Sequence, residues 1–322
     1  MTIVTAPEER HPRTMTEQQI PESDATAEVA LPRYERPHEA AVAMEPLAID
    51  MLIPREGLEA AIAASALTPG ARDLLRGLVR LGRPAMFGGG GAGIEYGSLL
   101  KTACRPEFLG AHIREVAAHL RAERIDLLMV PGMSGYPVGA MYSVGAGIPA
   151  ILLKKQRHRP GADPSAFPPG AFVIPSYTGD GDVVMSADLE AIQDVIDGIV
   201  RAQIEARQEA ERLSLTLRVA GADDIIDKAT MSQAVSESAL VLGRAAIATT
   251  VERYREETGD PRPVDVDVRV VTWVTPLIKG YNRPHEHLMR WFGITPFAGL
   301  NVTGVHLDPP AIGIEGLGVV GF

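Results

Sequence analysis

Two adjacent carboxylates, Asp223 and Asp224, are the first candidates for chemistry in this sequence. They follow a stretch of alternating apolar residues, Leu213 to Val219, and precede a helix-like segment that begins near Thr230. Carboxylates at the end of a strand can bind sugar hydroxyls or a hydrated divalent cation, and backbone N–H groups at a helix start can hold a phosphate. An ordinary acidic loop with a helix cap fits the same residues, so the pattern alone leaves both interpretations open.

Basic side chains form a second group, Lys154 to Arg159, directly after an apolar stretch that predicts a strand over 148–153. In an acidic protein, a basic cluster at the carboxyl end of a strand is a candidate contact for an anion. A solvated basic turn explains the cluster equally well. His285 and His287 are spaced i, i+2, which faces them differently on a helix, so we expect a helix start after Pro284 rather than a zinc site.

Composition limits the function classes. The chain has 322 residues, 46% of them hydrophobic and 22% charged, and a net charge of −10, which favours neither nucleic acid nor an anionic membrane as a partner. The single cysteine, Cys104, fits a reducing compartment, and we expect a small buried residue rather than a catalytic thiol. The chain has no signal peptide pattern and its apolar runs are short and interrupted, so we expect a soluble cytoplasmic protein.

Apolar periodicity predicts an alternation of helices and strands. The order strand, loop, helix, strand over 125–153 is the unit of a parallel sheet with a right-handed crossover. The glycine-dense run Phe87–Gly93 matches no phosphate-loop pattern, and Lys101 lies too far beyond it, so we expect a loop there. Predicted helices cover 55–67, 70–81, 106–123, 138–146, 187–212 and 230–257, and predicted strands cover 125–130, 148–153, 172–175, 183–185, 213–219 and 264–274.

Three stretches, read together, resemble the type I phosphoribosyltransferase family. Asp126–His158 is similar to that family's strand, pyrophosphate loop, helix and next strand; Val173–Ile192 is similar to the hairpin after its flexible catalytic loop. The third, VAGADDIIDKATM from Val219 to Met231, is similar to the strand, Asp-Asp pair and loop that bind phosphoribosyl pyrophosphate (PRPP). The resemblance implies an α/β fold, a parallel sheet flanked by helices, with N- and C-terminal additions that form a hood or cap.

Composition and the resemblance together predict the domain organisation. We expect a flexible N-terminal tail or arm over 1–45, a core domain over 46–275, and a C-terminal extension over 276–322 that packs on the core or the acceptor site. A homodimer is the expected assembly, with the N-terminal segment as a possible exchanged arm.

The resemblance assigns roles to named residues. Asp223 and Asp224 would bind the ribose hydroxyls, directly or through Mg²⁺ and water, and are the implied metal ligands. Lys155 would neutralise pyrophosphate charge, and Arg157, His158 and Arg159 would belong to a loop that closes over the site. The implied contacts to PRPP are Met133, Ser134, Gly135, Tyr136, Lys154, Asp227, Lys228, Ala229, Thr230, Met231 and Ser232.

One departure from the family pattern concerns the turn after the acidic pair. The family has a Thr-Gly-Gly-Thr-like run there, whereas Lys228–Ser232 contains no glycine. Because Ala and Thr disfavour positive φ, we expect a phosphate cradle that is altered or abolished, with Lys228 as a possible replacement by direct charge.

The expected function is a Mg²⁺-dependent transfer of phosphoribosyl from PRPP to a small acceptor, with release of pyrophosphate. The alternatives are a non-catalytic sensor of PRPP or a nucleotide, and a related enzyme with altered chemistry. Aromatic candidates for the acceptor pocket are Tyr281, Trp291, Phe292, Tyr96 and Phe87.

Overall fold

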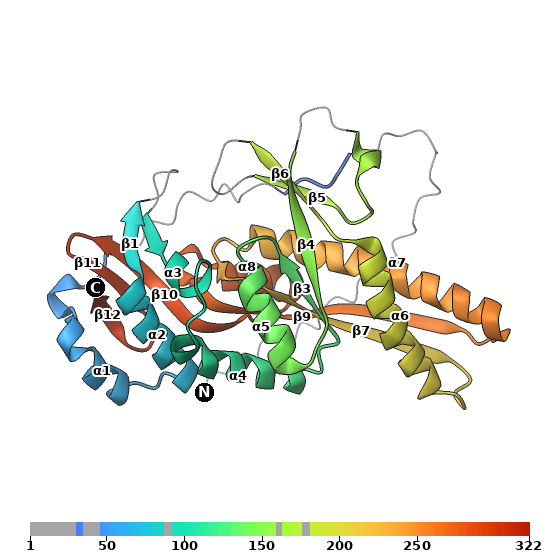
Figure 1. The fold of residues 1–322 in the computed structure, drawn as a ribbon, viewed down its shortest axis with the longest axis horizontal. Helices are drawn as coiled ribbons and strands as arrows, with labels where there is room; N and C mark the ends of the chain where they lie inside the picture. Colours follow the sequence, from blue (N-terminus) through green and yellow to red (C-terminus); the bar gives the residue numbers. More distant parts are fainter. Residues whose placement is uncertain (1–29, 35–45, 87–91, 159–162, 176–180) are drawn as a thin grey trace, which may run out of the picture. The chain divides into compact units, whose positions relative to one another are not determined.

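A computed structural model describes residues 30–34, 46–86, 92–158, 163–175 and 181–322. The chain divides into two compact units, 1–30 and 31–322. Of the first unit only Ala30 lies within the described residues, so the fold presented below is that of the second unit (Figure 1).

A sheet of ten strands forms the centre of this unit, in the order β12-β11-β10-β9-β7-β3-β4-β6-β5, with β8 paired to β9 (Figure 1). The strands are β3 (Leu127–Pro131), β4 (Ala150–Arg157), β5 (Phe172–Pro175), β6 (Asp182–Ser186), β7 (Leu213–Ala222), β8 (Ile225–Ile226), β9 (Val264–Lys279), β10 (Phe297–Leu307), β11 (Pro310–Ile314) and β12 (Gly318–Gly321).

The five strands β10, β9, β7, β3 and β4 are parallel, and the antiparallel pairs lie at the two ends of the sheet. From β3 the chain crosses to β4 on one side, and from β7 it continues to β9 and β10 on the other. The strand order therefore reverses between β3 and β7. In open α/β sheets a crevice opens at this point, beyond the carboxyl ends of the strands.

Helices cover both faces of the sheet. Leu128 and Val130 of β3 join a core with α2 (Pro69–Leu81), α4 (Pro106–Ala122) and α5 (Tyr136–Ala146). Leu127 and Met129 point to the opposite face, where they join a core with α6 (Leu189–Glu205), α7 (Thr230–Thr258) and α8 (Pro284–Phe292). The prediction of an α/β sheet flanked by helices is confirmed.

The remaining elements are short. A hairpin of β1 (Arg83–Met86) and β2 (Ala92–Glu95) leads into α3 (Gly97–Leu100), and α1 (Leu58–Ala64) precedes α2. Single 3-10 turns cover Ile49–Met51, Arg55–Gly57, Pro164–Ala166 and Gly280–Asn282.

Several element boundaries differ from the sequence predictions. Strand β4 extends through the basic residues to Arg157, because it pairs with β6 over that length. Helix α6 ends at Glu205, before the predicted 212, and β9 continues past 274 to Lys279. Thr68 lies between the predicted helices 55–67 and 70–81 and caps α2: its hydroxyl accepts from Ala71 N–H.

The ends of the unit take part in the sheet. Strand β9 runs across residue 275, and the predicted C-terminal extension contributes β10, β11 and β12 to the same sheet. Residues 31–34, within the predicted tail, lie beside β5, where Tyr34 N–H donates to Val173 O at 2.9 Å. The glycine run is described only at 92–93, within β2, and its residues 87–91 lie outside the described part.

Two expectations are wrong. Cys104 is exposed rather than buried. The apolar runs were expected to be too short for a membrane span, yet α7 has 29 residues and a mean hydropathy of 1.2 over its most apolar window, enough by length and composition. In that window 61% of the residues are buried, because α7 packs on α6, β3, β7 and β9 as a core helix.

Candidate functional site

A cavity of about 450 Å³ lies at the reversal of strand order, beyond the carboxyl ends of β3 and β7. The turn 131–134 after β3 and the segment 223–232 after β7 form two of its walls. Lys155 of β4, Ile174 and Pro175 of β5, Lys279 of β9, and residues 94–96 and 101 from the hairpin region complete the lining. Stretches far apart in the sequence thus meet in one pocket.

Asp224 is the buried member of the acidic pair, with 1% of its surface exposed. Its Oδ2 accepts a hydrogen bond from Tyr96 OH at 2.7 Å and lies 3.3 Å from Lys101 Nζ. The same ammonium group lies 4.7 Å from the centre of the Tyr96 ring, a cation–π contact. One oxygen of Asp224 is therefore bound to two side chains of the same short segment.

Asp223 faces the turn after β3. Its Oδ1 accepts a hydrogen bond from Asp224 N–H at 2.9 Å. A Cβ placed on Gly135 would lie 2.8 Å from that oxygen and 2.9 Å from Pro131 O, so only glycine fits where the two loops meet. Burial, and then the neighbouring charge of Asp224, raise the pKa of Asp223 well above its usual range, and Lys101 opposes this with a smaller effect.

Asp227 belongs to a separate ion-pair cluster in the cavity. It accepts a hydrogen bond from Lys279 Nζ at 2.9 Å and another from the Asn282 side-chain amide. Lys279 is only 7% exposed, so its charge needs a partner inside the fold. The pair connects the end of β9 to the turn that precedes α7.

The start of α7 also lines the cavity. Ala229 adopts a left-handed conformation, with φ of 61° and ψ of 5°, and Gln233 N–H donates to Ala229 O at 2.8 Å. The expectation that this turn avoids positive φ is wrong at Ala229. The N–H groups of residues 230–232 precede the first intrahelical bond and have no acceptor within the helix, which suits an anion.

Thr230 adds a polar group to this wall. Its Oγ1 is buried and has no hydrogen-bond partner among the described residues. Met231 and Ser232 also line the cavity, as do Lys228 and Ala229. All five residues of the predicted phosphate turn therefore face one space.

The predicted pyrophosphate contacts divide into two groups. Met133, Ser134 and Lys155 line the cavity, whereas Lys154 points to the other face of β4 and pairs with Asp188 at 3.0 Å. Gly135 lies behind Asp223, against its carboxylate.

Other predicted residues lie outside the lining. Tyr136 donates its hydroxyl proton to Leu153 O, and burial raises the pKa of its phenol. Arg157 ends β4 and His158 N–H donates to Asp182 O at 3.0 Å, so neither reaches the lining, and Arg159 lies outside the described residues.

Sequence reasoning did not find two of the cations. Lys101 follows α3 and Lys279 ends β9, and no local pattern relates either residue to the acidic pair. Of the aromatic candidates, Tyr96 lines the cavity. Trp291 and Phe292 pack on the core beneath α7, Tyr281 packs on the core of the opposite face, and Phe87 lies outside the described residues.

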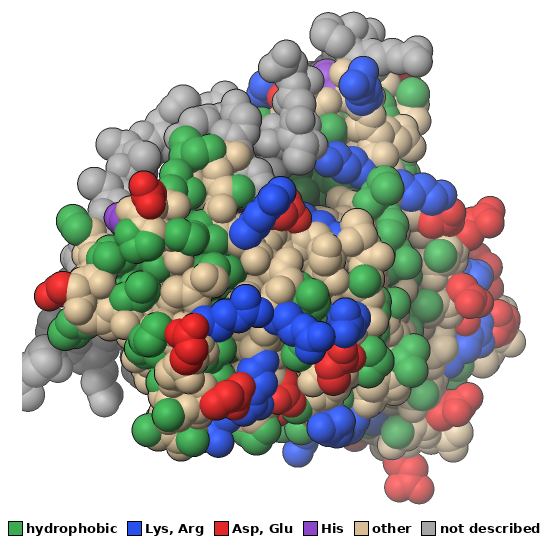
Figure 2. Space-filling model, turned by 60° about the vertical axis from the view of Figure 1, so that its left-hand side comes forward, with side chains coloured by type: hydrophobic (Ala, Val, Ile, Leu, Met, Phe, Trp, Pro, Cys, Tyr) green, Lys and Arg blue, Asp and Glu red, His purple; other side chains and the backbone are tan. Residues whose placement is uncertain are grey.

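Acidic and basic side chains line the cavity in equal number, although the whole chain carries −10. The lining contains four carboxylates, Glu95, Asp223, Asp224 and Asp227, and four ammonium groups, Lys101, Lys155, Lys228 and Lys279. The face drawn in Figure 2 likewise shows basic and acidic side chains interspersed over its lower part. A negatively charged ligand therefore meets no excess of negative charge here.

These residues do not fit a divalent cation on the acidic pair. Such a cation needs several oxygen ligands that are free to turn toward it. Asp224 Oδ2 is already engaged by Tyr96 and Lys101, and Asp227 by Lys279. Among the described residues, no group of three or more His, Cys, Asp or Glu side chains could hold a metal ion.

Of the comparisons with known proteins, only the one with solved structures finds similar chains. No family model and no curated protein matches the chain. Adenine phosphoribosyltransferase from Thermoanaerobacter pseudethanolicus is 14% identical, over 70% of this chain and 98% of that one, with a TM-score of 0.40. The enzyme from Rhodothermus marinus is 13% identical, over 70% and 97%, with a TM-score of 0.40. That from Trypanosoma brucei, in complex with AMP, pyrophosphate and ribose-5-phosphate, is 11% identical, over 70% and 79%, with a TM-score of 0.38.

Proposed function

We propose that the protein binds PRPP in this cavity and transfers its phosphoribosyl group to a small acceptor, releasing pyrophosphate. One observation carries the proposal. The two stretches whose sequences resemble the pyrophosphate loop and the PRPP-binding turn, 131–134 and 223–232, both line a single cavity of about 450 Å³. A pocket of this size holds a small phosphorylated ligand.

Each wall of the cavity suits one part of PRPP. The start of α7 offers N–H groups and the positive end of a 29-residue helix to the 5-phosphate. Asp223 lies between the two loops, where its carboxyl group can hydrogen-bond a ribose hydroxyl. Lys155 and the backbone of 132–134 lie where the pyrophosphate would extend toward β4.

The chemistry requires positioned charges rather than a protein nucleophile. The bond between ribose C1 and the pyrophosphate oxygen breaks, an acceptor atom bonds to C1, and the acceptor loses a proton. The transition state has an electron-poor ribosyl centre and a strongly anionic leaving group. Lys155 would stabilise the leaving group.

The test is release of pyrophosphate from PRPP with a panel of nucleobase-like and other small acceptors. Asp224→Asn should lower turnover by about 100-fold or more, since it removes a charge beside the reacting sugar. Asp194→Asn, on the exposed side of α6, is the matched control and should leave turnover unchanged. Unchanged turnover in Asp224→Asn would contradict the assigned role.

A second candidate is a non-catalytic sensor of PRPP or a nucleotide. The observation that favours it is the engagement of Asp224 by Tyr96 and Lys101, which leaves this carboxylate less free to follow a reacting sugar. Calorimetric binding of PRPP without release of pyrophosphate, for every acceptor tried, would support the sensor over the enzyme.

A further inference from the structure

Lys101 places a positive charge directly beside the acidic pair. Its ammonium group lies 3.3 Å from Asp224 Oδ2, and the carboxylate is 1% exposed. Tyr96 OH reaches the same oxygen at 2.7 Å and supports the ammonium group from its ring face. Both side chains come from the segment between β2 and the end of α3, so the segment supplies a cation and a proton donor together.

The two remaining carboxylates of the cavity do not restore a metal site. Asp227 is held by Lys279 and Asn282, and Glu95 accepts a hydrogen bond from Gly97 N–H at 2.6 Å. A divalent ion on the acidic pair would also lie near the Lys101 charge and would be repelled by it. Lys101 and Lys279 are engaged by Asp224 and Asp227, so Lys155 and Lys228 are the lining ammonium groups that can meet an anionic ligand.

We propose that Lys101 replaces a divalent cation on the acidic pair, so that the site binds its phosphorylated ribose ligand without Mg²⁺. In this arrangement Tyr96 and Lys101 are positioning residues that hold Asp224 in place. Asp223, whose Oδ1 accepts the hydrogen bond from Asp224 N–H, also lines the cavity and is the carboxyl group placed to meet the sugar. The inference rests on the proposed function for the identity of the ligand, but its claim about metal does not.

The first experiment measures the metal directly, without any ligand. Mn²⁺, a paramagnetic substitute for Mg²⁺, is titrated into the full chain and followed by electron paramagnetic resonance. The wild-type protein should bind no Mn²⁺ at this site, whereas Lys101→Met, which removes the ammonium group, should gain one site. Arg105→Met removes an exposed ion pair with Glu107 four residues away and should gain none. Stoichiometric binding to the wild type that Asp224→Asn abolishes would overturn the inference.

The second experiment measures the ligand. Ribose 5-phosphate is the probe, because it lacks the pyrophosphate that itself chelates Mg²⁺ in solution. Calorimetry in EDTA and in millimolar Mg²⁺ should give the same Kd for the wild type. Lys101→Met should bind about tenfold more weakly in EDTA, the usual effect of losing one charge-assisted contact, and should recover affinity when Mg²⁺ is added. Lys101→Arg keeps the charge and should behave as the wild type.

The outcomes separate the two proposals. Wild-type binding that appears only with Mg²⁺ would overturn the inference and leave the proposed function standing. Failure of ribose 5-phosphate and PRPP to bind under either condition would overturn the proposed function, while the Mn²⁺ titration would still decide the role of Lys101. Because Lys101 is 41% exposed, Lys101→Met should fold, and circular dichroism verifies this.

Discussion

Ala229 combines a left-handed backbone, φ of 61°, with a methyl group that is 3% exposed. An L-residue in this conformation costs about 1–2 kcal/mol, and glycine avoids that cost while losing about 0.5–1 kcal/mol of backbone entropy. We therefore expect Ala229→Gly to leave the free energy of unfolding unchanged or slightly raised. Ala248→Gly, on the exposed side of the same helix, should cost about 1 kcal/mol.

Urea denaturation of the two variants measures this difference. If Ala229→Gly lowers the free energy of unfolding as much as Ala248→Gly does, the turn at Ala229 does not store the strain. The same pair of variants reports on the ligand, because the turn belongs to the cavity: if the turn keeps its shape, ribose 5-phosphate affinity should not fall in Ala229→Gly.

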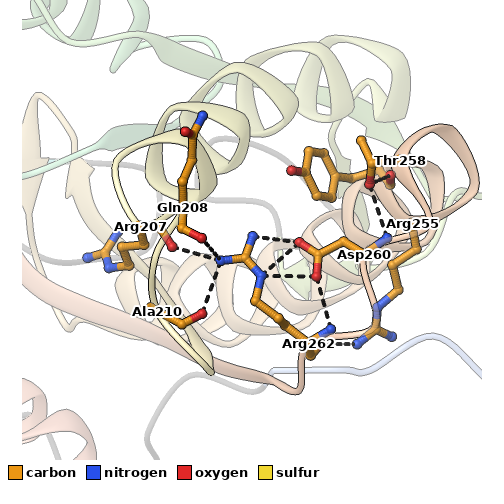
Figure 3. Close-up of polar contacts among 8 residues, drawn as sticks. Arg207, Gln208, Ala210, Arg255, Thr258, Asp260 and Arg262 are labelled. Carbon is orange, nitrogen blue, oxygen red and sulfur yellow. Dashed lines mark hydrogen bonds and ion pairs between the residues drawn. The ribbon is translucent and has the colours of Figure 1, made fainter.

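At the scale of elements, one arginine joins two connections at the end of the sheet opposite the cavity. Arg262, between α7 and β9, donates from Nη1 to the carbonyl oxygens of Arg207, Gln208 and Ala210 in the connection between α6 and β7 (Figure 3). It also forms a paired contact with Asp260, and this hydrogen bonding lowers the pKa of the Asp260 carboxyl. Both side chains are mostly buried, at 17% and 12% exposed.

Arg262→Met should loosen the connection over 206–212 because three carbonyl groups each lose a hydrogen bond from the guanidinium group. Faster amide hydrogen exchange there, together with a lower Tm, is the expected result, with the cavity segments 131–134 and 223–232 unaffected. Arg212→Met removes an exposed ion pair with Asp265 in the same region and should change neither quantity measurably. Unchanged exchange over 206–212 in Arg262→Met would contradict the role of this arginine.

The elements were largely predictable from local sequence, because burial imposes periodicity. The helix predicted over 106–123 is α4, Pro106–Ala122, and its buried side chains follow the helical repeat. The strand that ends in the acidic pair is buried on both faces from Val219 onward and ends at Ala222. Its two carboxylates therefore lie at the carboxyl end of a central strand, as the sequence predicts.

The contacts around the acidic pair were not predictable from local sequence. Tyr96 and Lys101 lie more than one hundred residues before Asp224, and only the folded chain brings them to it. The basic cluster, for which the sequence leaves an anion contact and a solvated turn both open, belongs to strand β4 over Lys154–Arg157, where β6 pairs with it. The alternation of the strand sends Lys154 and Lys155 to opposite faces. Long-range pairing, which leaves no periodic pattern, decided both cases.

At the scale of the whole molecule, one buried histidine connects the elements on one face of the sheet. His112 of α4 is 1% exposed, and its Nε2 lies 2.8 Å from Tyr142 OH of α5. A Cβ on Gly299 of β10 would lie 3.0 Å from the His112 ring. Burial raises the pKa of Tyr142 far above its usual range, so the phenol keeps its proton, and the tautomer of the neutral His112 ring decides which of the two groups donates.

Burial lowers the pKa of His112 to about 4, against about 6.5 in the unfolded chain. Between pH 4 and pH 6.5 the unfolded state binds more protons than the folded state, so the free energy of unfolding rises with pH in this range. The contribution of His112 is therefore fully present above pH 6.5 and is lost as the pH falls toward 4. From pH 7 to pH 5 the protonation of His112 should lower the free energy of unfolding by about 2 kcal/mol.

Urea denaturation at the two pH values measures this effect. The free energy of unfolding of His112→Gln, whose side-chain amide can still accept from Tyr142, should decline by that amount less than the wild-type value does. His285→Gln, at an exposed position, should decline as the wild type does. An equal decline in His112→Gln and the wild type would show that other groups cause the acid sensitivity.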